Sequence, residues 1–159
     1  MDMNDLMQRI VAQRGGYPTK ETILDANPKH KTEVIAFVKM WKKSVWMEAR
    51  KLTPEVKFNA LKDLIQTIAE EHYQKPVDVE YQEDVHSCAY NPSRNTIILN
   101  SSLSIISSLH ELAHHLFGSS EKKACIWSVH LFRKTFPTAY GRLHWNGHML
   151  VKNQDVCSQ

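Results

Sequence analysis

The feature that most constrains the fold is a change in the spacing of apolar residues near Pro76. Between residues 31 and 51, apolar residues recur at steps of three and four along one helical face: Val34, Ile35, Val38, Trp41, Val45, Trp46 and Ala49. After Pro76, the stretch 77–81 (VDVEY) alternates apolar and polar residues, as a half-buried strand does. We therefore expect an α+β chain in which a helical part, 1–75, meets a part with strands, 76–159.

The same patterns and their flanking residues predict the individual elements. Helices are expected over 2–14, from Thr19 or Thr22 to before Pro28, over 31–51, from Pro54 to about Tyr73, over 104–117 and over 121–136. The fourth of these would bury Val56, Phe58, Leu61, Leu64, Ile65 and Ile68. Strands are expected over 77–81, 86–90 and 96–99, and a hairpin around Asn146-Gly147 within 143–150. The residues 100–102 and 119–120 offer caps for the last two helices, and Pro137 should end the second of them.

Length and composition favour one globular domain over residues 1–159. A chain of 159 residues with 42% apolar and 23% charged residues can bury a core without cross-links. No stretch reaches the roughly 18 to 20 continuous apolar residues of a membrane span, and the start, MDMNDLMQRI, lacks the basic flank and apolar run of a secretory signal. Cys88, Cys125 and Cys157 have no paired spacing. We expect a cytoplasmic protein.

Charge is unevenly distributed along the chain. Residues 28–57 contain eight Lys or Arg against three acids, and residues 76–111 contain one Arg against five acids. The basic stretch falls on predicted amphipathic helices, so a solvated helix face is the simpler interpretation. A surface that docks a protein partner or nucleic acid is the alternative.

The stretch 108–118 (SLHELAHHLFG) carries the clearest chemical signal. His110 and His114 are four residues apart, so on a helix both imidazoles lie on one face and can bind one metal ion. Glu111 follows the first histidine and would lie beside the metal, where it can deprotonate a water. The opposite face of this helix carries apolar residues that would pack on a sheet: Leu109, Leu112, Ala113 and Leu116. The pattern predicts a catalytic Zn²⁺ site; histidines on the surface of an amphipathic helix are the alternative.

A catalytic zinc site usually has three protein ligands, so a third is expected beyond His114. Metzincin spacing would put a glycine and a histidine where Phe117 and Ser120 stand, which excludes that class. Glu121 is the best candidate, because the chain should reverse at Gly118 and Glu121 would begin the next helix. A carboxylate that stabilises the helix N-terminus is its alternative role.

Other histidines and cysteines compete for roles at the site. Cys125 and His130 lie further along the same predicted helix and are weaker candidates for the third ligand. His115 should face solvent or form a structural hydrogen bond. His144 or His148 could stabilise an oxyanion, although a plain hairpin is simpler. His86 and Cys88 are weak candidates to support the ligands.

From about Tyr90 to Tyr140 the chain resembles the small zincin-like metallopeptidases. The similar segments are AYNPSRNTIILN, SLHELAHHLFG, EKKA and FPTAY. A strand, a helix with HELAHH and an ExxA at the next helix start resemble the ImmA/IrrE type, which are intracellular peptidases that act on transcriptional repressors. The stretch WSVHLFRKTFPTAY is also similar to the SprT/WLM-like group, whose usual third ligand is histidine, where this chain offers Glu121. The resemblance implies a minimal zincin-like domain, with zinc on His110 and His114 and Glu111 as general base.

These observations lead to one main functional hypothesis and one alternative. The first is a zinc-dependent endopeptidase that acts on an intracellular protein or peptide, with a transcriptional regulator as one candidate substrate. The second is a non-proteolytic zinc-containing regulator that binds a protein or DNA through its N-terminal helices; a closed structural zinc site with Cys125 or His130 would be a third. Trp41 and Trp46 could wall the cleft, but core packing is the simpler expectation.

Overall fold

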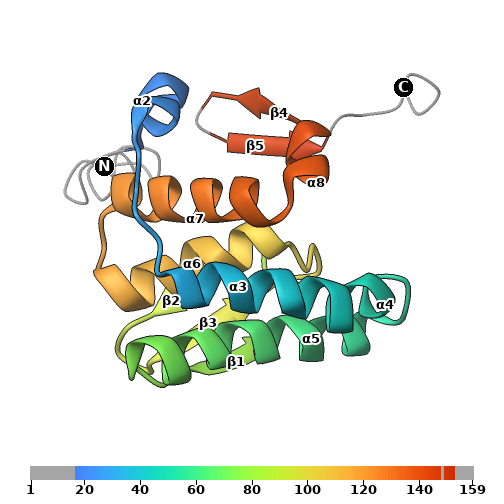
Figure 1. Cartoon of the computed structure of the whole chain (residues 1–159). Helices are drawn as coiled ribbons and strands as arrows, with labels where there is room; N and C mark the ends of the chain where they lie inside the picture. The colour runs from blue at the N-terminus through green and yellow to red at the C-terminus, as the bar shows by residue number, and fades with distance from the viewer. Residues whose placement is uncertain (1–16, 148, 153–159) are drawn as a thin grey trace.

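The computed structural model describes residues 17–147 and 149–152 and confirms a mixed α+β chain (Figure 1). The helices are α2 (Lys20–Asp25), α3 (Thr32–Trp41), η1 (Lys42–Trp46), α4 (Met47–Ala49), α5 (Pro54–Thr67), η2 (Ile68–His72), α6 (Ile105–Phe117), α7 (Glu121–Thr135) and α8 (Pro137–Gly141). The strands are β1 (Asp78–Tyr81), β2 (Ala89–Asn91), β3 (Thr96–Leu99), β4 (Leu143–Asn146) and β5 (Met149–Lys152). The helix predicted over 2–14 lies outside the described residues.

The helical segment predicted over 31–51 is confirmed, with one π-helical interruption. It comprises α3, η1 and α4 in succession, and η1 is the π-helical turn. Trp41, just before this turn, and Trp46, its last residue, stack with ring centroids 5.4 Å apart, and both are buried. The two tryptophans therefore pack in the core and do not wall a cleft.

The next helix begins as its sequence predicts. Thr53 caps α5 by accepting a hydrogen bond from the backbone N–H of Val56, and Pro54 takes the first helical position. The prediction that Val56 faces the core is wrong, because its side chain is 37% exposed. Ala60, one turn further along the same face, is buried, so burial of this helix starts only after its first turn.

A three-stranded sheet covers one side of the helices. β3 is central, with β1 parallel and β2 antiparallel to it, which leaves β2 at an edge. The strand predicted over 86–90 is wrong at its start, because pairing begins at Ala89. The side chain of Asn100 explains the difference: its Nδ2 donates to the carbonyl of His86 (3.0 Å), and its Oδ1 accepts from the thiol of Cys88 (3.4 Å). These bonds hold the 86–88 backbone in a loop.

The second half of the chain contains the two helices that matter for the site. Ser104 caps α6, whereas the sequence indicated residues 100–102; those residues form a turn, and Leu103 has a positive φ of 44°. Ser120 caps α7, as predicted. Pro137 follows the end of α7 but also opens the short helix α8, because proline fits the first turn of a helix. The hairpin β4–β5 is confirmed, with Gly147 at φ 64°.

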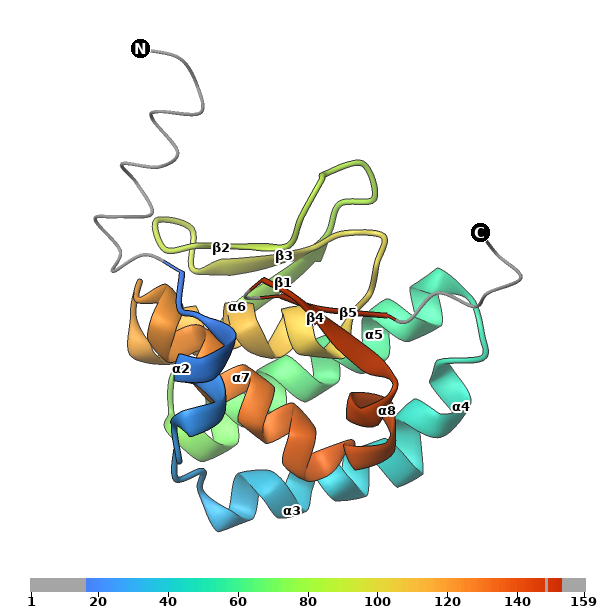
Figure 2. The same ribbon diagram turned by 90° about the horizontal axis from the view of Figure 1, so that it is seen from above.

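Two apolar clusters organise the described residues. The main core joins the helical first half to the sheet, α6 and α7; its members include Val38, Leu61, Ile97, Leu112 and Leu131. The small cluster, defined by Ile23, Cys125 and Val129, lies where α2 and the hairpin cover the opposite side of α7. Figure 1 shows α7 between these two layers, and in Figure 2, seen from above, α2 lies across α7.

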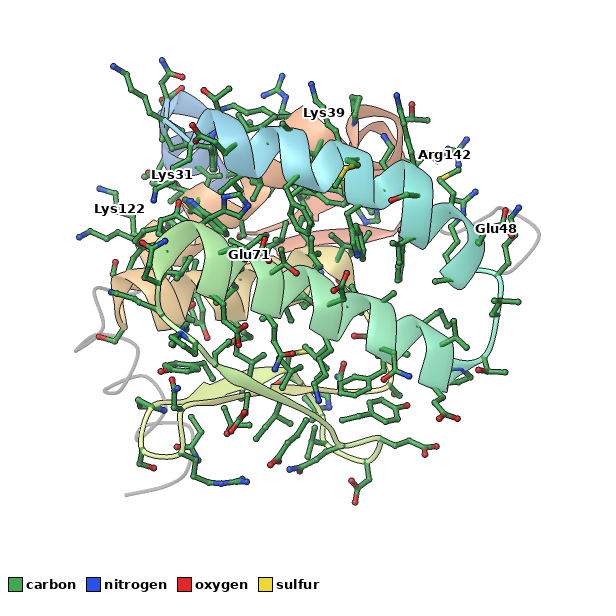
Figure 3. The ribbon with its side chains drawn as sticks, turned by 60° about the horizontal axis from the view of Figure 1, so that its bottom comes forward. Lys31, Lys39, Glu48, Glu71, Lys122 and Arg142 are labelled. Carbon is green, nitrogen blue, oxygen red and sulfur yellow. The ribbon has the colours of Figure 1, made fainter. Side chains whose placement is uncertain are left out.

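The basic stretch forms an exposed helix face. Lys39, Lys43 and Arg50 are exposed, and Figure 3 shows Lys39 pointing away from α3. Lys31 instead donates to the carbonyl of His72 and lies 4.1 Å from the ring centroid of Tyr73.

Candidate metal centre

Helix α6 presents two different faces. Its apolar residues Leu109, Leu112, Ala113 and Leu116 are buried in the main core, as the sequence predicts. His110 and His114 lie one turn apart on the other side, with ring centroids 4.9 Å apart. The apolar stripe that anchors α6 therefore also sets the direction of both imidazoles.

The reversal between α6 and α7 brings Glu121 to both histidines. Gly118 ends α6 with φ 106° and ψ −166°, a conformation that residues with a Cβ rarely adopt. The carboxylate of Glu121 then places Oε2 3.0 Å from Nε2 of His110 and Oε1 2.9 Å from Nε2 of His114. The three residues predicted as metal ligands are thus brought together around one carboxylate.

The second nitrogen of each imidazole also has a partner. Nδ1 of His114 lies 2.9 Å from the carbonyl of Gly118, to which it donates. Nδ1 of His110 lies 3.9 Å from Sγ of Cys125. A ligand histidine in metalloproteins usually donates its non-ligating N–H in this way, which fixes the tautomer and the ring orientation.

The electrostatics of the cluster favour a positive charge between these groups. Burial alone would raise the pKa of Glu121, but hydrogen bonds and charge interactions with His110 and His114 hold it well below its ordinary value. Burial likewise opposes protonation of His114, yet its hydrogen bonds to Glu121 and Gly118 outweigh burial and raise its pKa. The carboxylate is therefore ionised, and the site attracts a cation.

The donor set fits a zinc ion. If Nδ1 of neutral His114 donates to Gly118, its Nε2 lone pair faces a carboxylate oxygen at 2.9 Å, and two acceptors at this distance need a cation between them. A second ring proton or a metal ion satisfies this need. Two imidazole nitrogens and one carboxylate are a common ligand set of catalytic zinc. The side chains of His110, His114 and Glu121 are only 23%, 9% and 10% exposed, so the donors are largely shielded from water.

A second grouping of donors overlaps the first. His110, Glu121 and Cys125 offer ligand atoms that all lie within 4.8 Å of one another. Burial, with the nearby carboxylates of Glu121 and Glu111, raises the pKa of Cys125 to about 12, which disfavours the thiolate that binds metals. Moreover, the sulfur approaches Nδ1 of His110, whereas the carboxylate approaches Nε2.

Glu111 lies next to the two histidines that the sequence predicts as metal ligands. His110, Glu111 and His114 also form a group with ligand atoms within 4.8 Å of one another. Its carboxylate lines the same cavity as the histidines. This placement is what a general base next to a metal requires.

The cluster opens into a cavity of about 650 Å³ between α6, α7, the edge strand β2 and β5. His110, His114, Glu111 and Glu121 all line this cavity. The lining also includes apolar side chains: Tyr17, Tyr90, Ile106, Val129, Met149 and Leu150. Tyr17 and Met149 are half-exposed, which leaves the cavity accessible from solvent.

The other predicted candidates lie apart from the cluster. His130 is buried and its Nε2 lies 2.6 Å from the carbonyl of Ile23, so it ties α2 to α7. His115 forms structural hydrogen bonds, with Nδ1 3.0 Å from the Tyr90 hydroxyl and Nε2 2.7 Å from the carbonyl of Lys75. His144 is exposed on the hairpin, and His148 lies outside the described residues.

Two candidates lie near the edge strand instead. Cys88 lines the cavity, and its thiol donates to Asn100, while burial raises its pKa. His86 is exposed on the loop before β2 and contributes its carbonyl to Asn100. Asn100 therefore supports this wall of the cavity.

Several contributors were not identified from the sequence. Ile106 is four residues before His110, and Val129 is four residues after Cys125, so helical spacing alone would have placed both beside the cluster. The carbonyl of Gly118 and the ring of Tyr17 had no such signal. Their roles depend on the path of the chain between elements.

A scan against protein-family models, a search of curated proteins and a search of solved structures each return no match for this chain. Among residues 17–147 and 149–152, no helix has both the length and the apolar character to cross a membrane.

Proposed function

We propose that this protein is a zinc-dependent endopeptidase with a minimal zincin-like active site. The observation that carries the proposal is the carboxylate of Glu121, whose two oxygens each lie within 3.0 Å of a different histidine Nε2. A helix with two histidines, followed by a glutamate at the start of the next helix, is also similar to the ImmA/IrrE type. His110, His114 and Glu121 would hold the metal.

The residues around the cluster have distinct chemical roles in this proposal. Zinc, when bound, polarises a scissile carbonyl and lowers the pKa of a water. Glu111 accepts a proton from the attacking water and delivers it to the leaving amine. His114 is held in one tautomer by Gly118, which keeps its Nε2 available. The open cavity of about 650 Å³ admits an extended segment of a protein or peptide substrate.

The test is hydrolysis of a proteome-derived peptide library by the zinc-loaded protein, with products identified by mass spectrometry. We expect new peptide termini with wild type and none with Glu111→Gln, because the amide keeps the side-chain size but cannot take up the proton. Both proteins should contain the same amount of zinc. A wild-type protein that binds zinc and yields no termini would contradict the peptidase proposal and favour a zinc-containing regulator.

A further inference from the structure

Cys125 has a contact that the ligand set does not explain. It lies one turn after Glu121 on α7, is 6% exposed, and belongs to the small cluster with Ile23 and Val129. Its Sγ lies 3.9 Å from Nδ1 of His110. Glu121 meets the other nitrogen of the same ring, at 3.0 Å.

The two nitrogens of His110 therefore have different partners and different tasks. A neutral imidazole carries one ring proton, so if Nε2 offers its lone pair to a metal, Nδ1 carries the proton. In that tautomer the N–H at Nδ1 would be the donor and the sulfur of Cys125, a weak acceptor 3.9 Å away, its partner. His114 has the equivalent arrangement, with Nδ1 donating to the carbonyl of Gly118.

The chemistry of the thiol agrees with an acceptor role. The thiol is 6% exposed and its sulfur lies within 4.8 Å of a ligand atom of Glu121, surroundings that disfavour a further negative charge. A neutral sulfur next to an N–H accepts a hydrogen bond, and it does not add a third negative charge beside Glu111 and Glu121. Cys125 lies one helical turn after Glu121 on α7, so the same helix supplies one predicted ligand and the side chain that contacts another, His110.

We propose that Cys125 is a positioning residue of the metal centre, whose sulfur accepts a hydrogen bond from Nδ1–H of His110 and so fixes the tautomer and orientation of that ring. The inference rests on the proposed zinc site and assigns Cys125 a role other than ligand. Loss of such a supporting contact typically weakens metal affinity about 10- to 100-fold.

The first test is zinc affinity, measured by competition with a chromophoric chelator on wild type, Cys125→Ala, Cys125→Ser and Leu131→Ala. Cys125→Ala should weaken zinc binding about tenfold or more. Cys125→Ser should recover part of the loss, because a hydroxyl also accepts hydrogen bonds. Leu131→Ala removes buried volume from the main core on the same helix, away from the cavity, and should keep wild-type affinity. Equal affinity of Cys125→Ala and wild type, with folding confirmed by circular dichroism, would overturn the proposal.

The second test separates a positioning residue from a ligand. Cobalt-substituted wild type should lack thiolate-to-cobalt charge-transfer absorption in the near ultraviolet, whereas a cysteine ligand would produce it and overturn the proposal. Long-range ¹H–¹⁵N spectra of the zinc protein should show His110 protonated at Nδ1, and Cys125→Ala should shift that signal. Failure of wild type to bind zinc at all would overturn the zinc site and this role together, whereas normal zinc binding in Cys125→Ala would overturn this role alone.

Discussion

The two faces of the α6–α7 pair differ in how they are stabilised. The core face packs Leu109, Leu112 and Leu131 into the main core, where apolar burial needs no particular partner. The cleft face buries His110, His114 and Glu121, and each polar atom there depends on a specific neighbour. Stability therefore depends mainly on one side of these two helices and the proposed chemistry on the other. Substitutions on the core face should lower stability, and substitutions on the cleft face should affect metal binding and activity.

The largest expected effect is on the core face. Leu112→Ala removes a fully buried side chain and should lower the free energy of unfolding by about 2 to 5 kcal/mol. Glu111→Gln, at the neighbouring residue on the cleft face, should change the free energy of unfolding by much less in the metal-free protein. Urea unfolding followed by circular dichroism measures both. Similar losses in the two variants would show that the faces are not separate.

Metal addition should stabilise the protein through the cleft face only. Zinc at about one hundred times its dissociation constant should add about 2.7 kcal/mol to the free energy of unfolding, because only the folded chain brings the three ligands together. A chelator should reverse the gain. In Glu121→Ala this gain in stability should shrink or vanish. Val56→Ala, at an exposed position on α5 outside the cavity lining, should show the same gain as wild type. Calorimetric Tm values with and without zinc provide the measurement.

The turn between the helices connects the two faces. Gly118→Ala forces a Cβ into a backbone conformation at φ 106° and should cost about 1 to 3 kcal/mol, although no atom lies within 4 Å of the added carbon. It should also weaken zinc binding, because the carbonyl of Gly118 holds His114. Gly141→Ala is the matched control, since Gly141 has open space around it and an ordinary φ. Neither the free energy of unfolding nor the zinc affinity should fall in this variant. Unchanged zinc affinity in Gly118→Ala would remove the carbonyl from the account.

The smallest expected effect concerns His30, which lies in the segment between α2 and α3 and contacts α7. His30 places Nε2 2.9 Å from the carbonyl of Trp127 and Nδ1 3.0 Å from Nζ of Lys134. Burial, together with the charges of Lys134 and His130, lowers its pKa, although the bond to Trp127 acts in the opposite direction. The unfolded chain therefore takes up a proton that the folded chain resists, and the contribution of neutral His30 is complete above its ordinary pKa and is lost as pH falls below it.

The measurement is Tm in a chelator between pH 7.5 and pH 5.5. Wild type should lose more stability over this range than His30→Gln, because only wild type carries the His30 imidazole, whose protonation the folded state resists. All other titrating groups are the same in the two proteins. Parallel pH dependences would contradict the assignment to His30.

The elements could be predicted where the apolar period is long and unbroken. The stripes over 31–51 and 104–117 gave the correct helices, since each buries one continuous face. The errors fall where a single side chain decides the backbone. Asn100 moves the start of β2 to Ala89, and Pro137 opens a helix as readily as it ends one.

The site could be predicted in part for the same reason. His110 and His114 follow from helical spacing, and Glu121 follows from the reversal at Gly118. The contact of Cys125 with Nδ1 of His110 could not be predicted, because it depends on the angle between α6 and α7. The apolar wall from Leu150 and Tyr17 depends on how the two ends of the described chain pack on α7.

The most direct test is the zinc content of wild type and Glu121→Ala by elemental analysis, after purification without added metal and again after reconstitution. The three-ligand site predicts about one zinc per chain in wild type and a clear loss in Glu121→Ala. Full zinc in the variant would contradict the role of Glu121 as a ligand. Wild type without zinc, even after reconstitution, would contradict the metal centre itself.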